Sequence, residues 1–175
     1  MSDLAYPIGK FTWSGPGTAE DRARRIAEIA AAPAALREAV AGLSGAQLET
    51  PYRPGGWTVR QVAHHVPDSH MNAYVRFKLA VTEETPTIKP YDEKAWADLP
   101  DVRSVPVEAS LDLLARLHER WVAFLSALPG SDWKRTFQHP ELGVVSLEKS
   151  LALYAWHGRH HVAHVTSLRK RMGWG

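Results

Sequence analysis

The chain has 175 residues, 45% hydrophobic and 23% charged, with a net charge of +2. This length suits a single globular domain, residues 1–175, with a sizeable core. Cysteine is absent, which excludes disulfides, a cysteine nucleophile and thiolate metal ligands. The cations are scattered among acids and no apolar run is long enough to span a membrane, so we expect a cytoplasmic protein with neither a nucleic acid nor a membrane as partner.

The first part of the chain predicts an extended arm and then helices. Residues 1–17 are rich in glycine and proline and predict an arm that packs aromatic side chains. Thr18 and Asp21 resemble a capping box that opens the first long helix, and Pro33 interrupts its pattern, so this helix is either kinked or split in two. Ser44, followed three residues later by glutamine, forms a second capping box and predicts a short helix.

A second long helix is predicted over residues 58–84. Thr58 opens it with a third capping box. Pro67 leaves one backbone carbonyl without its usual amide partner, so we expect a kink directly after His65. The four prolines of residues 84–106 exclude a long helix there, and we expect a long irregular connection that covers one end of the bundle as a lid.

Two further long helices complete the prediction. Leucines and aromatic residues at intervals of three and four predict a helix over about 107–128. The segment 133–146 lacks a helical period and predicts a small hairpin that turns at residues 140–143. Ser146 caps the last helix, 147–171, which ends in a cationic turn. No strand of convincing length is expected, so the fold class is an all-α four-helix bundle.

Four of the nine histidines lie in residues 156–164 of this last helix. His157, His161 and His164 recur at i, i+4 and i+7, which places their imidazoles on one helical face. Neutral imidazole is the commonest protein ligand of transition metals, and two rings one turn apart can bind one ion from the same side. The glutamate of the HExxH motif is missing, which excludes that class of metalloprotease.

A third ligand must come from elsewhere, and the nearest source is the cluster His64, His65 and His70. His64 and His65 are adjacent and point about 100° apart on a helix, so at most one of them faces a given partner. If the second and last helices pack together, His65 meets His157 and His161. Three protein ligands with open positions are typical of catalytic rather than structural zinc sites.

The other candidate residues have open or structural interpretations. His164 continues the histidine face and is either a fourth ligand or a residue that holds a water molecule or another imidazole in place. We expect the lone histidines His70, His118 and His139 to be surface or hydrogen-bonded core residues. We expect the tryptophans Trp57, Trp121 and Trp156 to lie in the core. Near the site, Arg60 and Arg159 are expected to be solvated or ion-paired.

Five sequence blocks are specific enough to indicate a family. They are YPIG at residues 6–9, PYRPGGWTVRQVAHHVPDSHMNAYVRFKL at 51–79, PYDEKAW at 90–96, HGRHHVAH at 157–164 and RMGW at 171–174. Together they resemble the YfiT branch of the DinB-like superfamily over nearly the whole chain. The resemblance implies a four-helix bundle, a homodimer, and one divalent metal per chain, zinc or alternatively nickel, held by one histidine of the second helix and two of the last.

The resemblance also implies which histidines bind the metal. The first ligand of the family lies eight residues after the tryptophan that precedes the second helix, which maps onto His65. The HxxxH pair of the last helix maps best onto His157 and His161. The register His160 with His164 has the same spacing and stays open as an alternative, ranked second because many relatives place glutamine where this chain has His164.

Two activities are consistent with the resemblance. The branch is described as metal-dependent hydrolases, while close relatives resemble transferases that join a small thiol, bacillithiol, to electrophiles. An open metal position lowers the pKa of the group bound there, giving hydroxide for hydrolysis or thiolate for transfer. We expect first an S-transferase whose partners are a small-molecule thiol and an electrophile. The second interpretation is a hydrolase with Asp68, three residues after His65, as base, and the third is a structural metal or a binding module.

Overall fold

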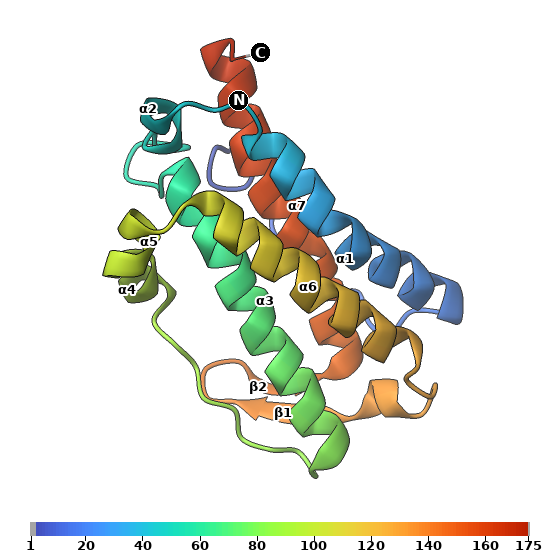
Figure 1. Ribbon diagram of the computed structural model, residues 1–175. Coiled ribbons are helices and arrows are strands. Elements are labelled where there is room, and N and C mark those ends of the chain that lie inside the picture. Colours follow the sequence, from blue (N-terminus) through green and yellow to red (C-terminus); the bar gives the residue numbers. More distant parts are fainter. Residues whose placement is uncertain (1–2, 175) are drawn as a thin grey trace.

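Four long helices form the body of the protein, which the computed structural model describes over residues 3–174 (Figure 1). They are α1 (Ala19–Val40), α3 (Val59–Thr82), α6 (Val107–Ser126) and α7 (Leu147–Met172). The shorter elements are helices α2 (Gly45–Leu48), α4 (Glu93–Ala97) and α5 (Pro100–Ser104), a 3-10 turn at Asp132–Lys134, and strands β1 (Thr136–His139) and β2 (Gly143–Ser146). The architecture is the predicted all-α four-helix bundle.

Local capping explains where the helices begin. The side chains of Thr18, Ser44 and Thr58 each accept a hydrogen bond from the backbone amide three residues later, and all three capping boxes are complete. Ser146 caps α7 in the same way, without the reciprocal bond. Because a capping box satisfies amides that the first helical turn leaves free, a few residues suffice to fix each start. All four predicted starts are confirmed.

The two internal prolines interrupt the helices less than expected. Pro33 lies inside α1 and Pro67 inside α3, and both helices are continuous through them. Of the two alternatives at Pro33, a kink or a split, the split is therefore wrong. The ribbon of α3 likewise runs as one helix (Figure 1). Each proline removes one hydrogen bond to the residue four positions earlier, and packing of the helix against its neighbours compensates for that loss.

The connection between α3 and α6 is more ordered than the predicted irregular segment, since it contains α4 and α5. Nε2 of Gln61 donates to the carbonyl of Ala97 at 3.1 Å and to a carboxylate oxygen of Asp98 at 3.0 Å, which ties α4 to α3. Figure 1 shows the segment running along the outside of α3 rather than across one end of the bundle. Strands β1 and β2 form the predicted hairpin, paired antiparallel over four residues each.

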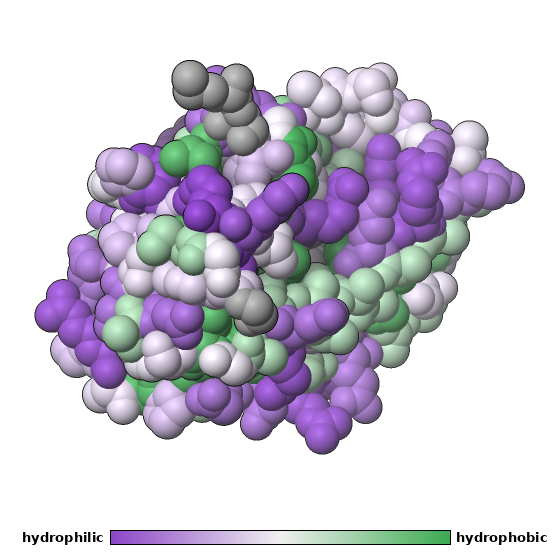
Figure 2. All heavy atoms as spheres, turned by 90° about the horizontal axis from the view of Figure 1, so that it is seen from above, coloured by the Kyte–Doolittle hydropathy of each residue, from purple (hydrophilic) through white to green (hydrophobic). Residues whose placement is uncertain are grey.

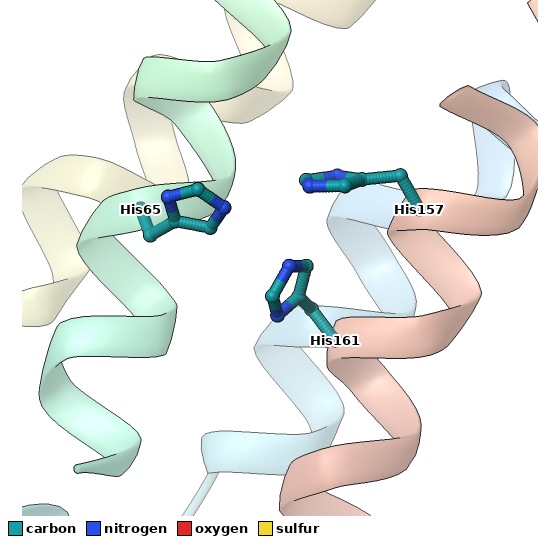
Figure 3. A group of neighbouring side chains, drawn as sticks. All are labelled: His65, His157 and His161. Carbon is teal, nitrogen blue, oxygen red and sulfur yellow. The ribbon is translucent and has the colours of Figure 1, made fainter. Parts of the chain in front are cut away.

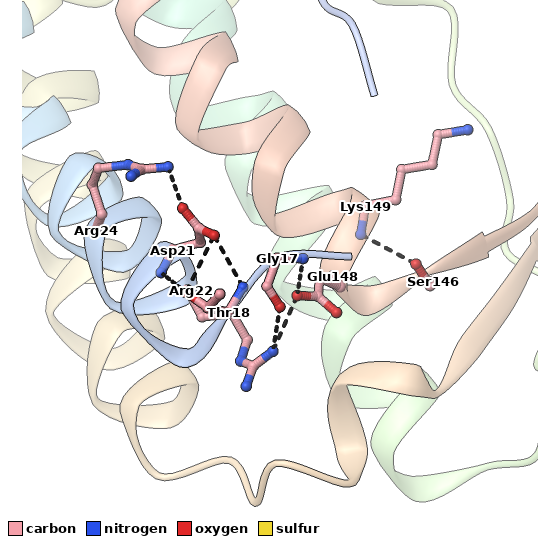
Figure 4. A network of polar contacts seen from close by, with 8 residues as sticks. All are labelled: Gly17, Thr18, Asp21, Arg22, Arg24, Ser146, Glu148 and Lys149. Carbon is pink, nitrogen blue, oxygen red and sulfur yellow. Dashed lines mark hydrogen bonds and ion pairs between the residues drawn. The ribbon is translucent and has the colours of Figure 1, made fainter. Parts of the chain in front are cut away.

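Helices α1 and α7 run in the same direction, opposite to α3 and α6 (Figure 1). At their N-terminal ends, the buried carboxylate of Glu148 accepts from the amide of Gly17 at 3.0 Å and from Arg22 at 3.1 Å (Figure 4). At their C-terminal ends, Arg169 donates to the carbonyl of Ala39 at 2.9 Å. These contacts fix the position of α7, the helix with most of the histidines.

The core consists of two hydrophobic clusters, one toward each end of the bundle. Phe77, Trp121 and Leu151 belong to the first, and Val62 and Val165 belong to the second. Along α3, α6 and α7, buried histidines lie between the residues of one cluster and those of the other. The bundle therefore contains a polar layer of histidines between two apolar layers.

The end of the bundle that carries α2 and the C-terminus of α7 has a mixed surface. Seen from this end, groups of hydrophilic side chains alternate with side chains of intermediate hydropathy and with hydrophobic patches (Figure 2). The cationic last turn of α7, Arg169 to Arg171, belongs to this end. None of the helices in residues 3–174 combines the length and the apolarity needed to cross a membrane.

Candidate metal centre

Three imidazole rings converge between α3 and α7 (Figure 3). His65 comes from α3, while His157 and His161 come from successive turns of α7. Each ring offers one nitrogen, and these nitrogens lie within 4.8 Å of one another. The ring centroids are 5.4 Å apart for His65 and His157, 4.8 Å for His65 and His161, and 4.5 Å for the pair on α7. Within residues 3–174, this is the one group of three acidic, histidine or cysteine side chains close enough to hold an ion.

The surroundings keep these rings uncharged. Burial lowers the pKa of His65 to about 4. Burial also holds the pKa of His157 and that of His161 well below the ordinary value, and the neighbouring histidines lower both further. A neutral imidazole has a free lone pair, so all three rings can act as ligands at neutral pH. Three nitrogen donors fit zinc, nickel, copper or iron, and they suit calcium and magnesium poorly.

Two open cavities meet at this centre. The first has a volume of about 710 Å³ and is lined by all three histidines together with Tyr6, Tyr52, Arg53, Trp57 and Trp156, among others. The second, of about 780 Å³, is lined by residues including Ser69, Arg76, Tyr91, His139 and Tyr154. Both cavities reach His157, Glu93 and Lys94. Two molecules could therefore approach the centre from different directions.

Comparison with known proteins assigns the chain to a family. Residues 28–165 match the DinB superfamily. The chain belongs to the DinB superfamily. It is 57% identical over 174 residues, covering 99% of this chain and 100% of each relative, to proteins of Bacillus cereus strain 03BB102 and Bacillus thuringiensis subsp. konkukian, both named "Putative metal-dependent hydrolase".

Two solved structures are similar to this chain. YfiT from Bacillus subtilis, described as a probable metal-dependent hydrolase with an unusual four-helix bundle topology, has a TM-score of 0.96 and 50% identity, covering 98% of this chain and 99% of YfiT. The four-helix bundle protein TT2238 has a TM-score of 0.52 at 24% identity, covering 83% of this chain and 95% of TT2238, and supports the fold alone. The predicted resemblance to the YfiT branch of the DinB superfamily is confirmed.

His160 and His164 do not join the converging group of this superfamily member. The ring of His160 stacks on Trp156 at 4.2 Å, and the ring of His164 stacks on Tyr52 at 3.9 Å. Nε2 of His164 lies 3.1 Å from the carbonyl of Ala5, and its Nδ1 lies 3.4 Å from Nδ1 of His161. The structure thus brings His157 together with His65, whereas His164 contacts His161 without joining the three converging rings.

Asp68 lies apart from the three rings. It lines neither of the two cavities that meet at His157. Burial and the nearby carboxylate of Asp101 on α5 raise the pKa of Asp68 to about 6. A general base must reach the proton that it removes, and Asp68 does not face the space in which a substrate would bind. The acids that line the first cavity are instead Glu93 and Asp98 of the α4 segment.

Several residues outside the ligand set have the expected structural roles. Trp121 is fully buried in the core. Arg60 pairs with Glu49, and Arg159 pairs with Glu28 at 3.5 Å. The expectation was wrong for Trp156, which is only partly buried and lines the first cavity. Trp57 also lines that cavity, but it packs against the second hydrophobic cluster as expected. Aromatic residues beside a histidine face are equally compatible with core packing and with a cavity wall, so the sequence does not distinguish the two.

His70 and His118 are the histidines whose importance the helical spacing does not indicate. Both are buried, at 0% and 2% exposure, and both are hydrogen-bonded, as expected for core histidines. His70 bonds to the candidate ligand His157 and to His118, and neither His70 nor His118 is one of the three converging rings. The signal that could have found them is their position in the histidine layer of α3 and α6, between apolar residues of the two hydrophobic clusters.

Proposed function

We propose that this protein is a metal-dependent S-transferase. In this proposal His65, His157 and His161 hold one divalent transition metal, zinc or alternatively nickel. The enzyme joins a low-molecular-weight thiol of the bacillithiol type to an electrophilic small molecule. When bound, such a metal lowers the pKa of a thiol that coordinates to it and favours the nucleophilic thiolate.

The meeting of two cavities at His157 carries this proposal. A transferase must hold two substrates with their reacting atoms in contact, whereas hydrolysis needs room for one substrate and a water molecule. Each cavity has a volume in the range of small-molecule sites. The two cavities share Glu93 and Lys94 of α4, which line both spaces beside His157. A thiol in one cavity and an electrophile in the other would meet at the metal centre.

The composition of the chain and of the site is consistent with a nucleophile that enters with a substrate. The sequence has no cysteine, so a thiol must come from a cosubstrate. Arg53 gives the first cavity a cation, and its Nε is buried without a hydrogen-bond partner. An anionic group on the thiol could supply that partner. The ring of Trp57 packs against His65 at 4.5 Å and holds it toward α7.

Hydrolysis is the second candidate function, because the relatives and YfiT are described as metal-dependent hydrolases. Water would then be the nucleophile. The nearest acids in the first cavity, Glu93 and Asp98, are both exposed to solvent.

The association state and the cellular location are further parts of the proposal. We propose a homodimer, which is common among the superfamily members that the sequence resembles. We also propose a cytoplasmic location, where small thiols are kept reduced. Sedimentation equilibrium of the zinc-loaded protein measures the first, and a mass of one chain would contradict it. Fractionation of the source cells tests the second, and recovery outside the cytoplasmic fraction would contradict it.

One assay separates the two activities. Zinc-loaded protein is incubated with 1-chloro-2,4-dinitrobenzene and either bacillithiol, cysteine or no thiol, and products are identified by mass spectrometry. The transferase proposal predicts a thioether and released chloride, formed faster than without enzyme, only when a thiol is present. The His161→Ala variant should give the uncatalysed rate. Turnover of ester or amide substrates without any thiol, and no acceleration of thioether formation, would favour the hydrolase.

A further inference from the structure

A chain of hydrogen-bonded groups leads from His157 across the bundle. Nδ1 of His157 lies 3.0 Å from Nε2 of His70 on α3. Nδ1 of His70 lies 2.7 Å from Nε2 of His118 on α6. Nδ1 of His118 lies 2.7 Å from the backbone carbonyl of Ile29 on α1. Each of the four long helices contributes one member of this chain.

The carbonyl at its end gives the chain one direction. A carbonyl oxygen only accepts hydrogen bonds, so Nδ1 of His118 must be the donor. A neutral imidazole has a single N–H, so Nε2 of His118 must accept from Nδ1 of His70. By the same argument, Nε2 of His70 accepts from Nδ1 of His157. The proton of His157 is therefore on Nδ1, and Nε2 is left with a free lone pair.

Burial keeps the rings of the chain neutral, as this argument requires. His70 is 0% exposed and His118 is 2% exposed, in the layer between the two hydrophobic clusters. Moving a charged ring into such surroundings without a carboxylate partner is costly. None of the hydrogen bonds found for either ring in residues 3–174 is to an acid. Burial lowers the pKa of His118, which does not contact the three converging rings, to about 4.

Pro33 explains why the carbonyl of Ile29 is available. In an α-helix this carbonyl would accept the amide of the residue four positions later. That residue is Pro33, which lies inside α1 and has no amide hydrogen. The proline therefore exposes an acceptor on the face of α1 that meets His118. Pro33 weakens α1 locally, and it thereby leaves the Ile29 carbonyl free to end the series of hydrogen bonds.

Gly158 lets the helices approach closely enough for the chain to form. It follows His157 on α7, and a Cβ atom placed there would lie 3.0 Å from Cβ of Ala32 on α1 and 3.7 Å from Cε1 of His70. A larger side chain would push α1 or the His70 ring away. The absence of a side chain at Gly158 therefore allows α1 and the His70 ring to pack closely against α7.

We propose that His70 and His118 are positioning residues that hold His157 in the tautomer with its proton on Nδ1, so that Nε2 is the ligand atom. The role of this tautomer in metal binding rests on the proposed function, but the tautomer itself can be measured without metal. Free histidine in water favours the opposite tautomer, with the proton on Nε2. Without the chain, part of the His157 population would therefore have its ligand atom blocked. Groups that orient metal-binding histidines in this way change metal affinity about 10- to 100-fold.

The direct test is the tautomer of His157 in the metal-free wild-type protein. Two-bond ¹H–¹⁵N correlation spectra of ¹⁵N-labelled protein distinguish protonated from unprotonated ring nitrogens. The proposal predicts that His157, His70 and His118 all carry the proton on Nδ1. A proton on Nε2 of His157 would overturn it, whether or not the protein binds metal. If the predicted tautomers are found but the protein takes up no metal, the proposed function is wrong, whereas the inferred hydrogen-bond directions from His157 to Ile29 are correct.

Variants of His118 test the effect on metal binding. His118→Leu removes the acceptor for His70, and we expect zinc to bind about 10- to 100-fold more weakly. His118→Gln keeps one donor and one acceptor, and it should restore most of the affinity. His64→Leu is the matched control, because His64 is also buried but bonds to Ser110 at 2.7 Å, away from the site. Wild-type affinity in His118→Leu, or equal losses in His118→Leu and His64→Leu, would overturn the proposal.

Discussion

The ring of His65 on α3 lies 4.8 Å from the ring of His161 on α7, although more than half of the chain separates the two residues in sequence. Two long helices hold these rings, and the Glu148 and Arg169 contacts fix α7 against α1 at both ends. The site is therefore built on rigid elements and does not depend on a loop. Rigid placement of neutral imidazoles favours one strongly bound metal ion.

Metal removal should lower stability without unfolding the protein. The two hydrophobic clusters form independently of any ion, so the metal-free protein should keep its helical circular dichroism spectrum. A ligand that binds only the folded state stabilises it, by about 2.7 kcal/mol at 100 times Kd. We expect zinc to raise the melting temperature of chelator-treated wild type and to leave that of His161→Ala unchanged. A melting temperature of the wild type that does not respond to zinc would contradict this.

The metal-free protein should lose stability as the pH falls below 6.5. Burial lowers the pKa of His65, His118 and His160 to about 4, whereas unfolded histidine titrates near pH 6.5. The unfolded state therefore takes up protons first as the pH falls. Each such histidine lowers the free energy of unfolding by about 2 kcal/mol between pH 7 and pH 5. Asp68 acts in the opposite direction, because its pKa is raised to about 6.

Urea unfolding of the metal-free protein at pH 7 and pH 5 measures this effect. Because the histidines with lowered pKa outnumber the one aspartate, we expect a lower midpoint at pH 5. An equal or higher midpoint at pH 5 would mean that the histidine layer is hydrated or charged in the folded protein.

His164 should support His161 without binding the metal itself. Its Nε2 donates to the carbonyl of Ala5 at 3.1 Å, so its Nδ1 is free to accept from Nδ1 of His161 at 3.4 Å. We expect His164→Leu to weaken zinc binding about 10-fold, and His161→Ala to abolish it. Isothermal titration of both variants measures the difference. Complete loss of binding in His164→Leu would instead make His164 a ligand.

Glu148 should stabilise the fold through its buried contacts at the start of α7. Glu148→Ala leaves the amide of Gly17 and the guanidinium of Arg22 without their acceptor, and we expect a loss of about 2 to 3 kcal/mol. The control is Glu119→Ala, whose pair with Arg116 is exposed, and it should cost less than about 1 kcal/mol. Chemical denaturation of both variants tests this. Similar losses would show that the buried position has no special role.

The helix starts could be predicted because they depend on a few neighbouring residues. Thr18, Ser44, Thr58 and Ser146 each identify an N-terminus by a side chain that reaches an amide within the same turn. The pairing of His157 with His161 follows from helical spacing in the same way. Membership of the DinB superfamily was also evident from the sequence blocks.

What the sequence did not show depends on contacts between helices. His70 and His118 have no distinctive spacing, and their part in the chain to Ile29 appears only when α1, α3, α6 and α7 are packed together. Trp57 packs against the core and also lines the first cavity, and an aromatic residue before a helix does not reveal that second role. The alternative of a split at Pro33 overestimated the effect of one missing hydrogen bond in a well-packed helix.

The central claim is that one transition metal binds between α3 and α7. The most direct measurement is elemental analysis of untagged protein, purified without metal-affinity chromatography, beside His65→Ala, His161→Ala and the control His64→Leu. The account predicts about one equivalent of zinc or another transition metal in wild type and control, and none in the other two variants. No metal in wild type, with no uptake from added zinc, would contradict the account, and both enzymatic proposals would fall with it.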